Sequence, residues 1–180
     1  MRRLIVFVLI TIAASVCNAQ FNPNDTIVVC TQHFSGWNFV SNPVLRERGT
    51  DSCRQVFCNI APIGPCGCFG MFIGGGYYQQ GCIAENGRGY WIKVPGGTNC
   101  CISGGTIAQD TIDVTVGWNA FGTISYPIDT SSVTTIPPGI RASSYFGYSI
   151  GYLVVTTLQP GQGYWVKMRQ AGRLVLSSGL

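Results

Sequence analysis

Apolar residues along this chain occur in short runs that Gly, Pro and Asn interrupt, and after the first residues almost none recur with a helical period. Short runs rich in β-branched and aromatic residues are typical of antiparallel strands. The clearest run is residues 89–94 (GYWIKV), which occurs again as residues 163–168 (GYWVKM). The pattern therefore predicts an all-β fold.

The repeated strand has two different faces. Successive side chains of a strand point to opposite faces, so Tyr90 lies on one face while Trp91 and Lys93 share the other. We expect the Tyr90 face, and the Tyr164 face of the second copy, to pack in a core. The Trp–Lys face suits partial exposure, because a lysine stem covers apolar surface while its ammonium stays in water.

Further landmarks recur in the same order. A Gly-Trp-Asn occurs at 36–38 and again at 117–119, roughly 50 residues before each Gly-Tyr-Trp strand. The copies also align at 25–30 with 110–115, at 71–72 with 145–146, and at 100–105 with 174–179. We therefore interpret the chain as two homologous small antiparallel, sandwich-like β units in tandem. We expect Trp37 and Trp118 to fill one end of each core, because tryptophan buries a large area.

The first residues are typical of a signal peptide: two arginines, an apolar run over 4–14 and small residues before Gln20. This predicts a signal peptide at 1–19, a cysteine-rich first unit at 20–108 and a second unit at 109–180. The alternative is a lipoprotein acylated at Cys17, although Val16 is not the small residue usual before a lipidated cysteine. No later segment reads as a transmembrane helix, so we expect a secreted or cell-surface protein.

Charge is scarce in this sequence. Charged residues make up 10% of the chain, against an average of about 25%. Without residues 1–19, nine Lys and Arg remain against seven Asp and Glu, a net charge of +2. A protein without a Lys/Arg cluster is not suited to nucleic acid, and a surface with so little charge is poorly protected against association.

The cysteines, apart from Cys17, all lie in the first unit. They are Cys30, Cys53, Cys58, Cys66, Cys68, Cys82, Cys100 and Cys101. An even number in an oxidising compartment predicts four disulfides, which tie the irregular segment 42–76 to the sheet. The neighbours Cys100 and Cys101 point to opposite faces of a strand and so need different partners. The alternative is a zinc or iron–sulfur site at Cys66, Cys68, Cys100 and Cys101, but the sequence has no recognised C-x2-C pair; we expect no cofactor.

No catalytic set stands out. His33 is the only histidine, and Ser35 and Asp25 are near it only in sequence. Asp110 and Asp113 have an odd separation, so on one strand they face opposite ways, unlike the paired carboxylates of a glycosidase. We therefore predict that the protein is not an enzyme.

Aromatic residues offer a binding hypothesis. Those that could form stacking platforms for sugars are Tyr77, Tyr78, Trp91, Tyr145, Tyr148 and Trp165. The alternative is that these rings pack between the two units.

The motifs also resemble a known family. A Gly-Trp-Asn, a strand that ends at a proline, a variable stretch and then residues 158–167 (LQPGQGYWVK) resemble a β repeat of bacterial secreted and cell-surface proteins, such as type IX-secreted ones. The first copy departs from it in its cysteine-rich middle and in Asn86-Gly87 at the turn. The resemblance implies an accessory, non-catalytic surface module and brings no site residues.

Two functions follow as expectations. The first is a structural or adhesive protein, a self-assembling surface or fibre subunit whose partners are itself or other surface and matrix proteins. The alternative is a carbohydrate-binding module that holds polysaccharide on exposed aromatics.

Overall fold

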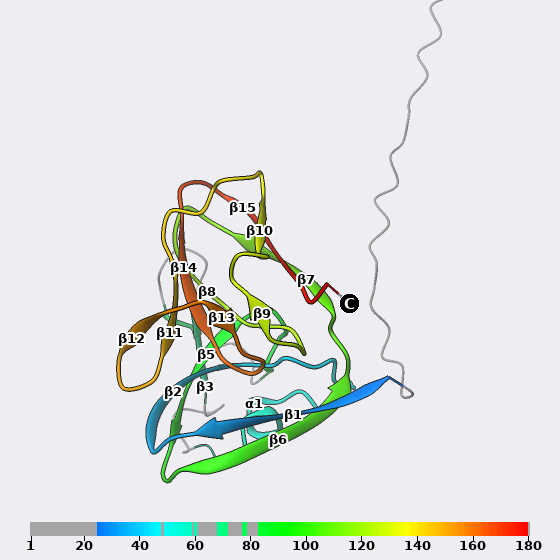
Figure 1. Ribbon diagram of the computed structural model, residues 1–180. Helices are drawn as coiled ribbons and strands as arrows, with labels where there is room; N and C mark the ends of the chain where they lie inside the picture. The colour runs from blue at the N-terminus through cyan, green and yellow to red at the C-terminus, as the bar shows by residue number, and fades with distance from the viewer. Residues whose placement is uncertain are drawn as a thin grey trace, which may run out of the picture.

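The computed structural model describes residues 25–47, 49–58, 60, 68–71, 77–78 and 83–179. These residues form antiparallel sheets and one short helix, so the predicted all-β fold is confirmed. We call the strands within 26–105 the first unit and those within 109–177 the second unit. Figure 1 shows the outer strands of the first unit below those of the second.

The first unit consists of a ribbon and a sheet. Strand β1 (Thr26–His33) pairs along its whole length with β6 (Thr98–Gly105). The sheet has the order β2-β5-β3-β4, from β2 (Gly36–Ser41), β5 (Gly89–Val94), β3 (Cys68–Met71) and β4 (Tyr77–Tyr78). Helix α1 (Cys53–Val56) lies in the segment between β2 and β3.

The second unit has the same plan. Strand β7 (Gln109–Val114) pairs with β15 (Gly172–Ser177), which also pairs with β10 (Thr134–Ile136). The sheet has the order β8-β14-β11-β12, from β8 (Gly117–Phe121), β14 (Tyr164–Met168), β11 (Tyr145–Tyr148) and β12 (Tyr152–Val155). The short strands β9 (Ile128–Asp129) and β13 (Thr157–Leu158) pair with each other.

The Gly-Trp-Asn motifs build identical turns. The Asn38 side chain accepts a hydrogen bond from the Phe34 amide at 2.9 Å and donates to the Phe34 and Gly36 carbonyls. Asn119 makes the same three bonds to Thr115 and Gly117. Gly36 has φ +97° and Gly117 has φ +94°, which a residue with a Cβ adopts only with strain. The motif is therefore a turn-forming device at the start of β2 and β8.

These turns change two expectations. Trp37 and Trp118 are 43% and 45% exposed, so the prediction that they fill the cores is wrong. The reason is the turn, which directs the asparagine of each motif inward and leaves the tryptophan on the outer face. The shared hydrogen bonds also show that Phe34 of the first unit corresponds to Thr115 of the second. The sequence alignment instead matched Thr115 with Cys30, four residues earlier.

Pairing with the Gly-Tyr-Trp strands corrects the alignment of the middle strands. Phe69 pairs with Trp91, and Phe146 pairs with Trp165. Residue 69 therefore corresponds to residue 146, and not residue 72 as the sequence alignment has it.

Each unit has its own core. Tyr90 and Tyr164 are buried, as predicted, and each hydroxyl accepts a hydrogen bond from a backbone amide, that of Glu85 or Gln159 respectively. The first core is centred on Val40, Tyr90 and Ile92; the second includes Phe121, Tyr164, Val166, Leu174 and Leu176.

Three disulfides join described cysteines: Cys30–Cys101, Cys53–Cys68 and Cys58–Cys100. Cys100 and Cys101 have different partners, as predicted. The Cys58–Cys100 bridge ties the segment after α1 to β6, while Cys30–Cys101 links directly paired residues of the β1–β6 ribbon. Three of the four cysteines proposed as metal ligands are thus bonded to other cysteines, which removes them as thiolate donors. Cys66 and Cys82 lie outside the described residues.

Candidate functional site

The two units meet around one phenylalanine. The Phe39 ring stacks with the indole of Trp91 at a centroid distance of 4.8 Å and with that of Trp165 at 5.5 Å. A Cβ built on Gly89 or on Gly163 would lie within 3 Å of this ring, so both positions need glycine for the ring to fit. Four residues thus surround Phe39. Gly89 and Trp91 come from the first Gly-Tyr-Trp segment, and Gly163 and Trp165 occupy the corresponding positions of the second.

Turns from each unit also bond to the other. The Ser41 amide donates to the Gly161 carbonyl at 2.9 Å, and the Gly122 amide donates to the Gly87 carbonyl at 2.9 Å. Ser41 ends β2, and Gly122, its counterpart in the second unit, directly follows β8. Gly87 and Gly161 occupy corresponding turns with φ +72° and +79°. This exchange relates the units by an approximate two-fold axis near Phe39.

Of the aromatics predicted as a sugar platform, Trp91 and Trp165 lie between the units and Tyr145 lies in the core of the second unit. Trp91 is 9% exposed, Trp165 is 8% exposed and Tyr145 is 2% exposed, so these three rings offer no face to a ligand. Tyr148 is half-buried and meets the Trp91 ring edge-on at 4.7 Å. Tyr77 and Tyr78 form β4, but their side chains lie outside the described part.

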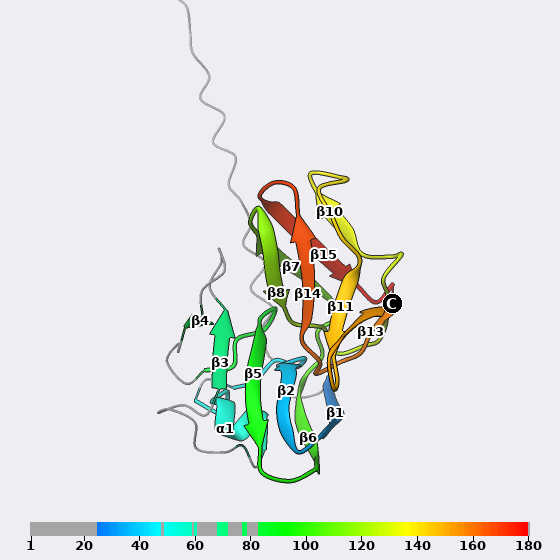
Figure 2. The same ribbon diagram turned by 90° about the vertical axis from the view of Figure 1, so that its left-hand side faces the viewer.

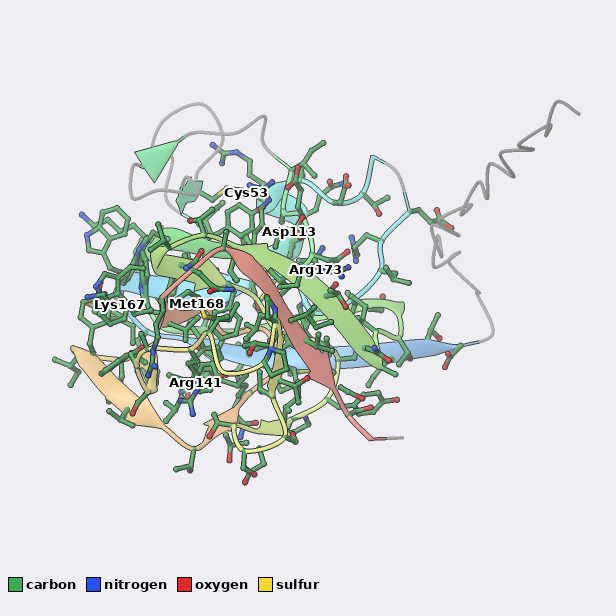
Figure 3. All side chains as sticks on the ribbon, turned by 90° about the horizontal axis from the view of Figure 1, so that it is seen from above. Cys53, Asp113, Arg141, Lys167, Met168 and Arg173 are labelled. Carbon is green, nitrogen blue, oxygen red and sulfur yellow. A yellow bond between two sulfur atoms is a disulfide. The ribbon has the colours of Figure 1, made fainter. Side chains whose placement is uncertain are left out.

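Two other aromatic residues, Trp37 and Trp118, are exposed on the face of the sheets to which Trp91 and Trp165 also point. Trp37 lies directly across from Lys93, and Trp118 lies directly across from Lys167, so each unit presents one tryptophan–lysine pair. Figure 2 shows β2 and β5 below β8, β14 and β11 on one side of the molecule. Figure 3 labels Lys167 and its neighbour Met168, of which the first is exposed and the second is buried. We call this surface the tryptophan face.

Sequence reasoning missed Trp37 and Trp118 as surface residues. The alternation of side chains along β2 separates Trp37 from the buried Val40. Pairing with β5 then puts Trp37 on the same face as Lys93, which indicates that Trp37 is exposed. That signal needs the register between β2 and β5, which the sequence does not provide.

A second apolar surface lies on the β11–β12 hairpin. Ile150 at its tip is 99% exposed, and Tyr152, Leu153 and Val154 are 60%, 47% and 59% exposed. Leu153 and Val154 are neighbours on a strand, so both faces of β12 carry exposed apolar side chains. Figure 1 shows this hairpin projecting at the left of the molecule.

Two corresponding grooves lie where a turn of one unit meets the ribbon of the other. One has a volume of about 300 Å³ and is lined by Glu85, Arg88, Asp110 and Asp113 among others. The other has a volume of about 310 Å³. At the positions that correspond to these four residues, it is lined by Gln159, Gln162, Val29 and Gln32. The geometry is shared, while only the first groove is charged.

The charges of the first groove are partly compensated within it. Arg88 forms an ion pair with Glu85. Asp110 accepts a hydrogen bond from the Thr111 amide at 2.7 Å, and burial raises the pKa of its carboxyl. Asp113 lies directly across from Arg173 on the neighbouring strand, and Figure 3 labels both residues. The groove suits a polar ligand.

The histidine lies in a buried environment. His33 is 1% exposed, and its Nε2 lies 3.3 Å from the Thr31 hydroxyl. Burial lowers the pKa of this imidazole. Ser35 is exposed and donates to the Pro95 carbonyl, so the two side chains have separate environments. Position 33 corresponds to Val114 of the second unit, which indicates a packing role for His33.

Within the described residues, no group of three or more His, Cys, Asp and Glu side chains could hold a metal ion. The same residues include no helix long and apolar enough to cross a membrane. Comparison of the chain with protein-family models, with curated proteins and with solved structures found no match.

Proposed function

We propose that this chain is a secreted, non-catalytic structural or adhesive protein that assembles with copies of itself or with other surface and matrix proteins. The observation that carries the proposal is the apolar surface of the second unit, where Ile150, Leu153 and Val154 are all about half or more exposed. Apolar groups gathered on a surface mark sites of association in soluble proteins. With charged residues at only 10% of the sequence, little electrostatic repulsion opposes that association.

Other features support an extracellular place for this activity. Three disulfides staple the first unit, and such bonds persist in oxidising compartments. Residues 1–19 have the pattern of a signal peptide. The resemblance to tandem modules of bacterial cell-surface proteins points the same way, and we propose that the two units arose by duplication of one.

The test is the state of the oxidised protein, starting at Gln20, in solution. Light scattering coupled to size exclusion, followed by negative-stain microscopy, is expected to show oligomers whose share rises with protein concentration. A protein that stays monomeric at every concentration and forms no regular assembly contradicts the proposal.

A second candidate is carbohydrate binding, favoured by the tryptophan face. Trp37 and Trp118 are almost half exposed, and each lies beside a lysine that can donate hydrogen bonds. Stacking on an indole is a common way to hold a sugar ring. Retention of the monomer on insoluble polysaccharide, lost in a Trp37→Ala/Trp118→Ala variant and kept in a Phe34→Ala variant, would favour this function over assembly.

A further inference from the structure

We propose that strand β12 of one copy pairs antiparallel with β12 of a second copy, joining two four-stranded sheets across a two-fold axis. This inference rests on the proposed assembly function and names the surface and the partner. Strand β12 is the last strand in the order β8-β14-β11-β12, and within the described part of the chain no strand pairs with its outer side. Its backbone therefore offers a strand edge of the kind that another chain extends.

The side chains of β12 make this edge apolar on both faces. Leu153 is 47% exposed and Val154 is 59% exposed, on opposite faces, and Ile150 stands fully in solvent at the hairpin tip. Edge strands are ordinarily protected from pairing by charge, by proline or by a bulge. Residues 149–157 contain no charged residue and no proline. The edge thus has the composition of a strand that pairs with another strand when the protein functions.

The absence of charge points to a second copy as the occupant. Two-fold pairing places a segment against itself, so any charge in it meets the same charge nearby. No charged residue occurs between Arg141 and Lys167, so β12 pays no such penalty. The edge strand β7 differs, because Asp110 and Asp113 would bring like charges together. Of these two edges, β12 is the one suited to pair with itself.

The opposite edge of the same sheet is less accessible. The Gly122 amide, just after β8, bonds to the Gly87 carbonyl, and Asn119 and Ala120 border the charged groove. The turn of the first unit thus stands beside β8, which disfavours a head-to-tail addition of β12 onto that edge. A closed dimer follows, and its aromatic surface is continuous with the unit interface through the ring contacts of Tyr148 with Trp91 and Tyr152.

The test compares one substitution on two edge strands of the oxidised protein. Val154→Lys places like charges near the two-fold axis and is expected to raise the dimer dissociation constant by about tenfold or more. Val28→Lys is the matched control, because Val28 is 64% exposed on β1 of the other unit. Light scattering across a range of protein concentrations measures both, and circular dichroism checks that each variant is folded.

Hydrogen exchange of the unaltered protein gives a second readout that needs no variant. The amides of 152–155 are expected to exchange more slowly as protein concentration rises, while those of β1 stay unchanged. Oligomers that persist in Val154→Lys, or that are lost in Val28→Lys, overturn the pairing of β12 but leave the assembly function standing. A wild-type protein that is monomeric throughout overturns both.

Discussion

The Phe39 ring of the first unit stacks on the Trp165 indole of the second, with centroids 5.5 Å apart and planes 19° from parallel. The position that corresponds to Phe39 in the second unit is Ala120, which packs half-buried against the same cluster. One large ring therefore occupies the approximate two-fold axis, where a second would compete for the same space. The join between the units depends on this difference between otherwise similar strands.

Replacing Phe39 is expected to weaken the whole protein. Phe39→Ala removes a ring that is 1% exposed and leaves a cavity between two tryptophans, at a cost of about 3–5 kcal/mol in the free energy of unfolding. Trp91 and Trp165 gain water contact, so tryptophan emission shifts to the red. Urea unfolding followed by fluorescence measures both effects. Phe34→Ala, at a ring 55% exposed, is the control and costs less than about 1 kcal/mol; an equal loss in both variants contradicts a special role for Phe39.

The Gly-Trp-Asn turns yield a prediction on hydrogen bonding. Asn119→Ala removes three bonds and is expected to cost about 1–3 kcal/mol. Asn119→Asp is expected to cost more at neutral pH, because a carboxylate replaces the donor that faces the Thr115 and Gly117 carbonyls. Thermal unfolding at two pH values separates the cases, since protonation of the new carboxyl restores a donor. Equal stability of the Asp variant at both pH values would show that the amide donor is unimportant.

Local patterns predicted much of this fold because strand alternation and turn chemistry are local. Tyr90 and Tyr164 are inward, and Gly87 of the Asn86-Gly87 turn has a positive φ of +72°. The burial of Trp91 and Trp165 does not follow from the local sequence. Alternation places them opposite the core of their own sheet. Across the unit boundary, Phe39 covers Trp165 and Tyr148 covers Trp91, while Phe39 also stacks on Trp91 within the first unit. A platform of exposed tryptophans and a buried interface have the same strand pattern, so the register and the docking of the units had to be known.

Disulfides of different exposure are expected to reduce in order. Cys30 and Cys101 are exposed on the β1–β6 ribbon, whereas Cys53, Cys68 and Cys100 are 2% exposed or less. Thiol exchange needs access to sulfur, so a mild reductant is expected to open Cys30–Cys101 first. Alkylation and peptide mapping follow the order. Before reduction, thiol titration of the denatured protein is expected to find almost no free thiols, and early labelling of Cys53 or Cys68 would contradict the order.

The buried His33 makes stability depend on pH. Burial lowers the pKa of this imidazole in the folded protein, while the unfolded chain binds a proton near pH 6.5. Below about pH 6.5 the unfolded state therefore holds more protons than the folded state, and the free energy of unfolding falls as the pH drops. Above that pH both states are neutral at this residue, and its contribution is constant. Urea unfolding between about pH 5 and 7.5 measures the slope, which one histidine limits to one proton.

The second unit supplies the control substitution for this effect. Val114 occupies the corresponding place and is 3% exposed, so His33→Val puts into the first unit a side chain that the same strand position already accepts. The variant is expected to lose the slope between about pH 5 and 6.5, because the carboxylates of the protein titrate mostly below that range. Its stability near neutral pH is expected to equal or exceed that of the wild type, since the Nδ1 atom of His33 is buried and has no hydrogen-bond partner among the described residues. A slope that survives in His33→Val assigns the pH dependence to other groups.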